Sequence, residues 1–188
     1  MNIRDFVNVF SREEIESNRV NIENSNILFP KNLYEATKEM CRAPKELRGF
    51  ILAEEMFFQN KKFYITKFFS KLGYENISSA YTQKNRLKAL ETLSSRNKEK
   101  IIIDFHTHQE CLGNEFHSRF SEQDFPSLIN AVNRQPLYKH VLFTPTHILT
   151  FGLDKPKFII LDLEKSSENY IRYQDEYNSI LKNLDTTI

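Results

Sequence analysis

The sequence predicts an α/β or α+β fold in which helices flank a mixed β-sheet. Helical and strand-like segments alternate irregularly, and a continuous apolar run at 100–106 is typical of a central strand buried on both faces. No glycine-rich phosphate loop follows any predicted strand. The length of 188 residues suits one domain. We expect a single unit over 1–188 with its core at about 28–165, a helical extension at 1–27 and a C-terminal helix at 166–185.

Composition and charge exclude several classes of protein. Hydrophobic residues make up 40% of the chain, which is enough to fill a core and excludes a disordered chain. The net charge of +1, with acids and bases mixed, offers no basic face to nucleic acid. The N-terminus lacks the apolar stretch of a signal peptide, and no apolar run is long enough for a membrane span. With only Cys41 and Cys111, a reduced chain is favoured over a lone disulfide, so we expect a soluble cytoplasmic protein.

Capping signals and amphipathic spacing predict the helices. A Ser-x-x-Glu capping box predicts a short helix over 11–17. Apolar residues recur at helical spacing over 32–43, with Asn32 and Glu35 as a possible cap, and over 82–97. In the C-terminal segment, tyrosines at helical spacing favour packing on the domain's own core, with a homo- or hetero-dimer contact as the alternative.

Runs of aliphatic and aromatic residues predict the strands. The segments 47–55 and 62–70 predict two strands that could pair as a hairpin. After the strand at 100–106, a polar loop leads into a helix predicted at about 124–134, because its Pro126 is tolerated only in a first helical turn. Three short strands are predicted last, at 139–145, 147–153 and 157–163.

Two histidines end the predicted central strand. His106 and His108 are spaced by two residues, so both side chains point to the same side of a strand. Two imidazoles, one carboxylate and one water make a tetrahedral zinc site with an open catalytic position. Asp124 can supply the carboxylate, because the loop over 109–123 is long enough to fold back. Ser121-x-x-Asp124 is also a helix N-cap signature, and capping is compatible with ligation.

A glutamate ahead of an early strand adds a third element to this pattern. In order along the chain, the sequence resembles the signature of the JAMM metalloproteases, whose fold is the MPN or JAB domain, at Glu46-x-x-Gly49, His106-x-His108 and Ser121-x-x-Asp124. The resemblance extends to the order of elements from about residue 28 to 165. It implies an MPN-like sheet with cytidine-deaminase-like layering and one Zn²⁺ per chain.

The resemblance also implies a mechanism and a substrate class. The zinc ligands would be His106, His108 and Asp124. Glu46 would act as general base and then general acid, and the Ser121 hydroxyl would stabilise the oxyanion. The reaction would be hydrolysis of a peptide or isopeptide bond, with a ubiquitin-like protein or its conjugate as the substrate. The extended tail of that substrate would lie beside an exposed strand.

The loop between the second histidine and the aspartate departs from the family. Gln109 stands where the family usually has proline, and the segment to Asp124 is longer than usual, which indicates a loop insertion. The inserted loop at 109–120 is therefore the candidate for shaping a substrate groove. Three of its residues are potential ligands that we interpret as loop or substrate-facing groups, with a ligand role left open for His117: Cys111, Glu115 and His117.

Several alternatives stay open at this point. His140 and His147 lie on predicted strands and are interpreted as structural residues, and Glu54 and Glu55 rank below Glu46 because they lack its Glu-x-x-Gly context. An amidohydrolase or PHP-type barrel also begins with Asp-x-His-x-His, but it would need ~250 residues built from its first strand onward, and only about 80 residues follow this motif, which argues strongly against that class. Two competing functions remain, an inactive MPN scaffold and a JAMM-like peptidase whose substrate is not ubiquitin-like.

Overall fold

The computed structural model of this chain describes most of the segment up to residue 161. The described residues are 7–17, 25–44, 46–58, 60–74, 101–113, 115, 117–134, 138–154 and 156–161. The helices predicted at 82–97 and 166–185 lie outside them. Among the described residues, no helix combines the length and the apolar character needed to cross a membrane.

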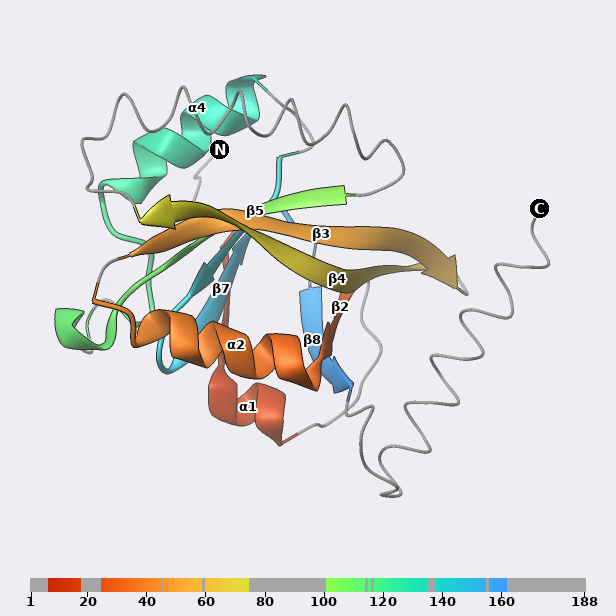
Figure 1. Ribbon diagram of the computed structural model, residues 1–188. Coiled ribbons are helices and arrows are strands. Elements are labelled where there is room, and N and C mark those ends of the chain that lie inside the picture. Colours follow the sequence, from red (N-terminus) through yellow and green to blue (C-terminus); the bar gives the residue numbers. More distant parts are fainter. Residues whose placement is uncertain are drawn as a thin grey trace.

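Within the described residues the fold is α+β, built on one mixed sheet of eight strands (Figure 1). The order of strands across the sheet is β1-β7-β6-β5-β3-β4-β2-β8. Strand β2 is parallel to both of its neighbours and β5 is parallel to β6, whereas the other pairs are antiparallel. The strands are β1 (Val7–Ser11), β2 (Ser25–Pro30), β3 (Leu47–Phe58), β4 (Lys61–Tyr74), β5 (Ile101–Thr107), β6 (His140–Phe143), β7 (His147–Phe151) and β8 (Pro156–Leu161).

The sheet curls until its two outer strands approach each other. Phe10 of β1 and Phe158 of β8 have ring centroids 5.2 Å apart, in an edge-to-face contact. These strands stand at opposite ends of the strand order, so the sheet is nearly closed. Curling in this way removes long open edges, which are otherwise prone to unwanted pairing.

Helices cover the two faces of the sheet separately. Helices α1 (Arg12–Glu16) and α2 (Lys31–Cys41) lie on one face, and α4 (Asp124–Arg134) lies on the other (Figure 1). On β5, Ile103 and Phe105 belong to the apolar cluster that contains the buried hydrophobic residues of α1 and α2. Because side chains alternate along a strand, the even-numbered residues of β5 point to the α4 face. That face carries the polar end of the strand.

Most of the predicted elements are present. Helix α1 has the predicted capping box, in which the side chains of Ser11 and Glu14 each bond the other residue's backbone N–H. The β3–β4 hairpin, the central position of β5, the bounds of α4 and the three last strands also agree with the prediction.

Two expectations about the N-terminal region differ from the structure. The segment expected as a helical extension also contributes strands β1 and β2, whose pairing with β7, β4 and β8 depends on partners distant in sequence. The cap expected from Asn32 is also wrong. Helix α2 begins directly after Pro30, and no side-chain hydrogen bond caps it.

Candidate metal centre

The two histidines of the site sit at the end of the central strand. His106 lies within β5, between β3 and β6, and is 2% exposed. His108 lies just past the strand and is 1% exposed; its backbone N–H donates to the carbonyl of Phe143 at 2.9 Å. This bond extends the β5–β6 pairing beyond the strand, so both imidazoles project from a rigid platform.

Asp124 reaches the histidines from the first residue of α4. Its Oδ2 atom accepts hydrogen bonds from the Ser121 backbone N–H at 2.8 Å and from the Ser121 hydroxyl at 2.6 Å. The Ser-x-x-Asp segment therefore forms the turn at the helix start and orients the carboxylate at the same time. Capping and delivery of a ligand are combined, as the sequence analysis allows.

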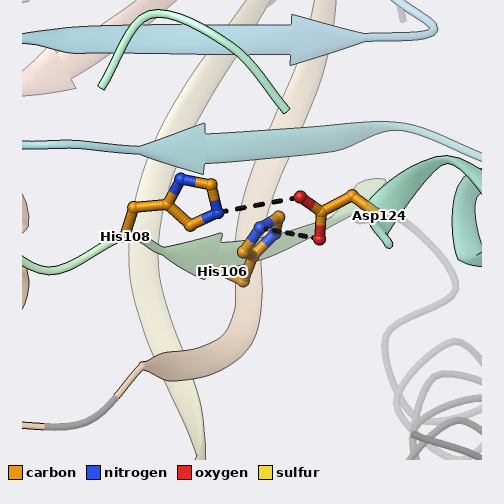
Figure 2. Close-up of side chains that lie close together, drawn as sticks. All are labelled: His106, His108 and Asp124. Carbon is orange, nitrogen blue, oxygen red and sulfur yellow. Dashed lines mark ion pairs between the residues drawn. The ribbon is translucent and has the colours of Figure 1, made fainter. Parts of the chain in front are cut away.

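The three side chains point toward one another (Figure 2). His106 Nε2 lies 3.2 Å from Asp124 Oδ1, and His108 Nε2 lies 3.7 Å from Asp124 Oδ2. One ligand atom from each residue falls within 4.8 Å of the others, and the described residues contain no other such group. Bonds of about 2.0–2.1 Å to a tetrahedral zinc ion would separate its ligands by roughly 3.3 Å. The distances from the two histidines to the Asp124 carboxylate oxygens lie close to that value.

The hydrogen bonding of His106 fits a metal ligand. Its Nε2 atom is buried and makes no hydrogen bond within the described part of the chain, although it faces the Asp124 carboxylate. Its other ring nitrogen, Nδ1, lies 2.7 Å from Nε2 of His140. Buried polar atoms in folded proteins nearly always have a partner. A cation bound between Nε2 and the carboxylate would supply the missing one.

The environment of His106 and Asp124 keeps both side chains in the protonation state that binding of a cation requires. Burial lowers the pKa of His106 and outweighs the opposite effect of the Asp124 carboxylate, so the imidazole is neutral near pH 7. Burial alone would raise the pKa of Asp124. The neighbouring histidines and the Ser121 hydroxyl outweigh it and hold the pKa of this carboxyl below its usual range. A neutral imidazole and an ionised carboxylate are the ligand forms of these residues.

Glu46 lies beside the cluster without belonging to it. Arg48 pairs with His106 across the β3–β5 ladder, and continuing this antiparallel register places Glu46 opposite His108. Residues that face each other across such a ladder point to the same side of the sheet. The Glu46 and Arg48 side chains are each 16% exposed, and Glu46 Oε2 lies 3.7 Å from an Arg48 nitrogen. The glutamate is thus a neighbour of the cluster, and the three residues that could hold a cation do not include it.

The loop residues singled out in the sequence occupy different environments. Glu115 is exposed and lies 3.5 Å from a guanidinium nitrogen of Arg119. His117 is 5% exposed, and both of its ring nitrogens lack a hydrogen-bond partner among the described residues. Cys111 lies in the short 3₁₀ turn Glu110–Leu112, and its side chain falls outside the description. Neither Glu115 nor His117 belongs to the cation cluster.

Three buried residues beside this site were not predicted from the sequence to belong to it. His140, interpreted from sequence as structural, bridges His106 to Asp104 through its two ring nitrogens, and Tyr138 donates a hydrogen bond to the same Asp104. Asp104 precedes His106 by two residues on one face of the strand, which is a signal that the sequence carries. The involvement of His140 and Tyr138 follows from the pairing of β5 with β6, which no local pattern reveals.

Comparison with known proteins adds no relative, because no protein-family model matches this chain and no curated protein matches it.

Proposed function

We propose that this protein is a zinc-dependent metalloprotease of the JAMM type, which hydrolyses a peptide or isopeptide bond. The observation that carries the proposal is the convergence of His106, His108 and Asp124, which could hold a metal ion, from two separate elements. The order of the motifs supports the assignment to the JAMM type. The JAMM signature combines a glutamate before an early strand, a His-x-His strand end and a Ser-x-x-Asp helix start. An MPN-like arrangement of the mixed sheet belongs to the same proposal.

The proposed roles follow from position and chemistry. Zn²⁺ held by the three ligands would supply Lewis-acid chemistry and lower the pKa of a bound water. Glu46 takes a proton from the attacking water and delivers it to the nitrogen of the leaving amine. Its place opposite His108 in the extended register, outside the ligand set, suits a residue that moves protons.

Ser121 has two candidate roles at this site. Its hydroxyl donates to Asp124 Oδ2, which orients the ligand carboxylate. In the proposed reaction the hydroxyl turns to the developing oxyanion, and the Ser121 backbone N–H, which also bonds Oδ2, keeps the carboxylate in place. A small hydroxyl side chain suits both positions.

The proposed substrate is a ubiquitin-like protein or its conjugate, with the inserted loop shaping the groove for its tail. The loop packs beside the centre, because the His117 carbonyl accepts a hydrogen bond from Thr144 at 2.7 Å. Phe143, the residue before Thr144, accepts a hydrogen bond from the backbone N–H of His108. A peptidase acting on another substrate and an inactive scaffold that pairs with a second MPN domain are the competing proposals.

A pair of glutamate variants tests the proposal. Fusions that end in Gly-Gly, drawn from several ubiquitin-like proteins, are incubated with the zinc-loaded protein, and cleavage is followed by mass. Glu46→Gln should bind zinc like the wild type and lose cleavage, because it cannot accept the proton. Glu54→Gln, on the same strand, is the control and should cleave normally.

Two outcomes contradict the proposal. Cleavage that survives in Glu46→Gln with zinc bound removes the assigned base. A zinc-loaded wild type that cleaves no amide substrate, whether fusion or peptide, leaves the scaffold as the better account.

A further inference from the structure

A chain of buried polar side chains leads away from the candidate metal centre. His106 Nδ1 lies 2.7 Å from His140 Nε2, and His140 Nδ1 lies 3.0 Å from Asp104 Oδ2. The Tyr138 hydroxyl donates to the same carboxylate oxygen and lies 3.0 Å from His140 Nδ1. The chain therefore runs from a carboxylate, through one imidazole, to the imidazole that faces the cation position.

These groups are buried among apolar residues of the α4 face. Asp104 is 2% exposed, His140 1% and Tyr138 9%. Tyr138 itself belongs to the apolar cluster that includes Phe50 and Leu142. Burying polar groups at such a position costs free energy that an apolar core would avoid, unless each group is hydrogen-bonded. The arrangement requires an explanation beyond filling the core.

The hydrogen bonds fix where the protons lie. An ionised Asp104 can only accept, so His140 must donate to it from Nδ1–H. A neutral His140 then has a lone pair on Nε2, which accepts a hydrogen bond from His106 Nδ1–H. His106 is left with its lone pair on Nε2, the atom that faces Asp124 at 3.2 Å.

We propose that His140 is a positioning residue, which Asp104 and Tyr138 hold in place so that His106 presents Nε2 as a metal ligand. This inference rests on the proposed metal site, but it does not depend on the protein being a protease. Hydrogen bonding of the distal ring nitrogen fixes the tautomer and the ring orientation of a ligating histidine and makes it a better donor. Here the imidazole of His140 stands between the proposed ligand His106 and the carboxylate of Asp104.

The first measurement is the affinity for zinc, by competition with a chromophoric chelator, without any substrate. Replacing His140 with Leu should weaken binding by about 10- to 100-fold, the usual effect of losing such a partner. His140→Gln keeps an oxygen acceptor near His106 Nδ1 and should restore part of the loss. His147→Leu is the control. This residue lies at the start of β7, outside the hydrogen-bonded series of side chains, and the variant should bind zinc like the wild type.

The second measurement is the tautomer of His106 in the metal-free protein, from ¹⁵N–¹H correlation spectra. The wild type should carry the proton on Nδ1, and His140→Leu should lose this preference. Asp104→Asn serves as a second variant if His140→Leu does not fold. Because Asn lacks the charge that holds His140 Nδ1–H, this variant should also bind zinc more weakly.

The two measurements separate failure of this inference from failure of the metal site. A folded His140→Leu variant with wild-type affinity and an unchanged tautomer overturns the positioning role while the metal site stands. A wild type that binds no zinc but carries the predicted tautomer removes the metal site and with it the ligand role of His106, while the hydrogen-bond assignment of His140 stands. A wild-type His106 protonated on Nε2 overturns the inference outright.

Discussion

At the scale of single residues, the positive charge of Arg48 opposes the binding of a cation at the site. It faces His106 across the β3–β5 ladder, and its guanidinium contributes to the lowered pKa of that histidine, after burial as the main cause. The nearby Glu46 carboxylate, at 3.7 Å, offsets part of this positive charge. The arginine and glutamate therefore set the local potential that a bound ion experiences.

Replacing Arg48 with Met should strengthen zinc binding. Removing a like charge at this range, where the site is mostly buried, is expected to raise the affinity about 3- to 10-fold. Competition with a chelator measures the change. Arg119→Met, in the exposed part of the loop, is the control with no expected effect. Unchanged or weaker binding in a folded Arg48→Met protein would contradict the electrostatic assignment.

At the scale of elements, a buried arginine of α1 bonds both α2 and the segment after β6. Arg12 is 5% exposed; its Nε donates to the Thr144 carbonyl at 2.9 Å and its guanidinium donates to the Thr37 hydroxyl of α2 at 2.9 Å. Thr144 follows β6 and also bonds the carbonyl of His117 in the inserted loop. Arg12 and Thr144 together therefore link α1, α2 and the loop beside the metal centre.

Arg12→Met should destabilise the fold by about 2–4 kcal/mol, because it leaves the buried Thr144 carbonyl without this donor and removes a charged hydrogen bond to the Thr37 hydroxyl. Chemical denaturation measures the free energy of unfolding. The neighbouring Glu13 is exposed on the same helix, so Glu13→Gln is the control and should change stability by less than about 0.5 kcal/mol. Equal stability of the two variants would show that the buried hydrogen bonds are not needed.

Local sequence signals account well for some elements and poorly for others. The start of α4 could be predicted because Pro126 restricts where a helix can begin. The position of β5 could be predicted because a continuous apolar run ends in polar residues. The strands β1 and β2 could not be identified in the same way. Their hydrogen-bond partners are distant in sequence, and β1 is short and half exposed, so neither carries a strong local pattern.

The same distinction holds for the site. The candidate ligands were visible because His106 and His108 share one face of a strand and Asp124 begins a helix. The support from His140 was not visible, because it depends on the parallel pairing of Asp104 with His140. Residues that act through tertiary register have no spacing rule in a single sequence.

At the scale of the whole molecule, burial of the metal-free site makes folding sensitive to pH. Burial lowers the pKa of His106 in the folded protein, whereas the unfolded chain titrates near its ordinary value of about 6.5. Below that pH the unfolded state binds more protons than the folded state. The free energy of unfolding therefore decreases as the pH falls, by up to ~1.4 kcal/mol per pH unit from this one group.

Denaturation of the metal-free protein at about pH 7.5 and about pH 5.5 measures this effect, and a His106→Gln variant should show a smaller decrease. The lowered pKa of Asp124 acts in the same direction at lower pH, since its stabilisation is present above the ordinary value of about 3.9 and is lost as pH falls further. Stability that is constant between the two pH values would contradict the account of His106.

The whole sheet is what brings the site together. Strand β5 carries His106 and leads directly into His108. It lies between β3, which follows Glu46, and β6, which carries His140. Helix α4 closes this face with Asp124. Residues from four separate elements thus converge because β3, β5 and β6 are neighbours in the sheet, although they are far apart along the chain.

Zinc content shows whether His106, His108 and Asp124 form one metal site. The metal-free protein is titrated with zinc, freed of excess ion, and analysed for metal per chain. The wild type should retain about one zinc ion, and Asp124→Asn should lose it, because a tetrahedral site cannot spare one of three protein ligands. Asp154→Asn, at an exposed position, should retain the ion. A wild type without bound zinc, or equal retention by Asp124→Asn, would contradict the claim.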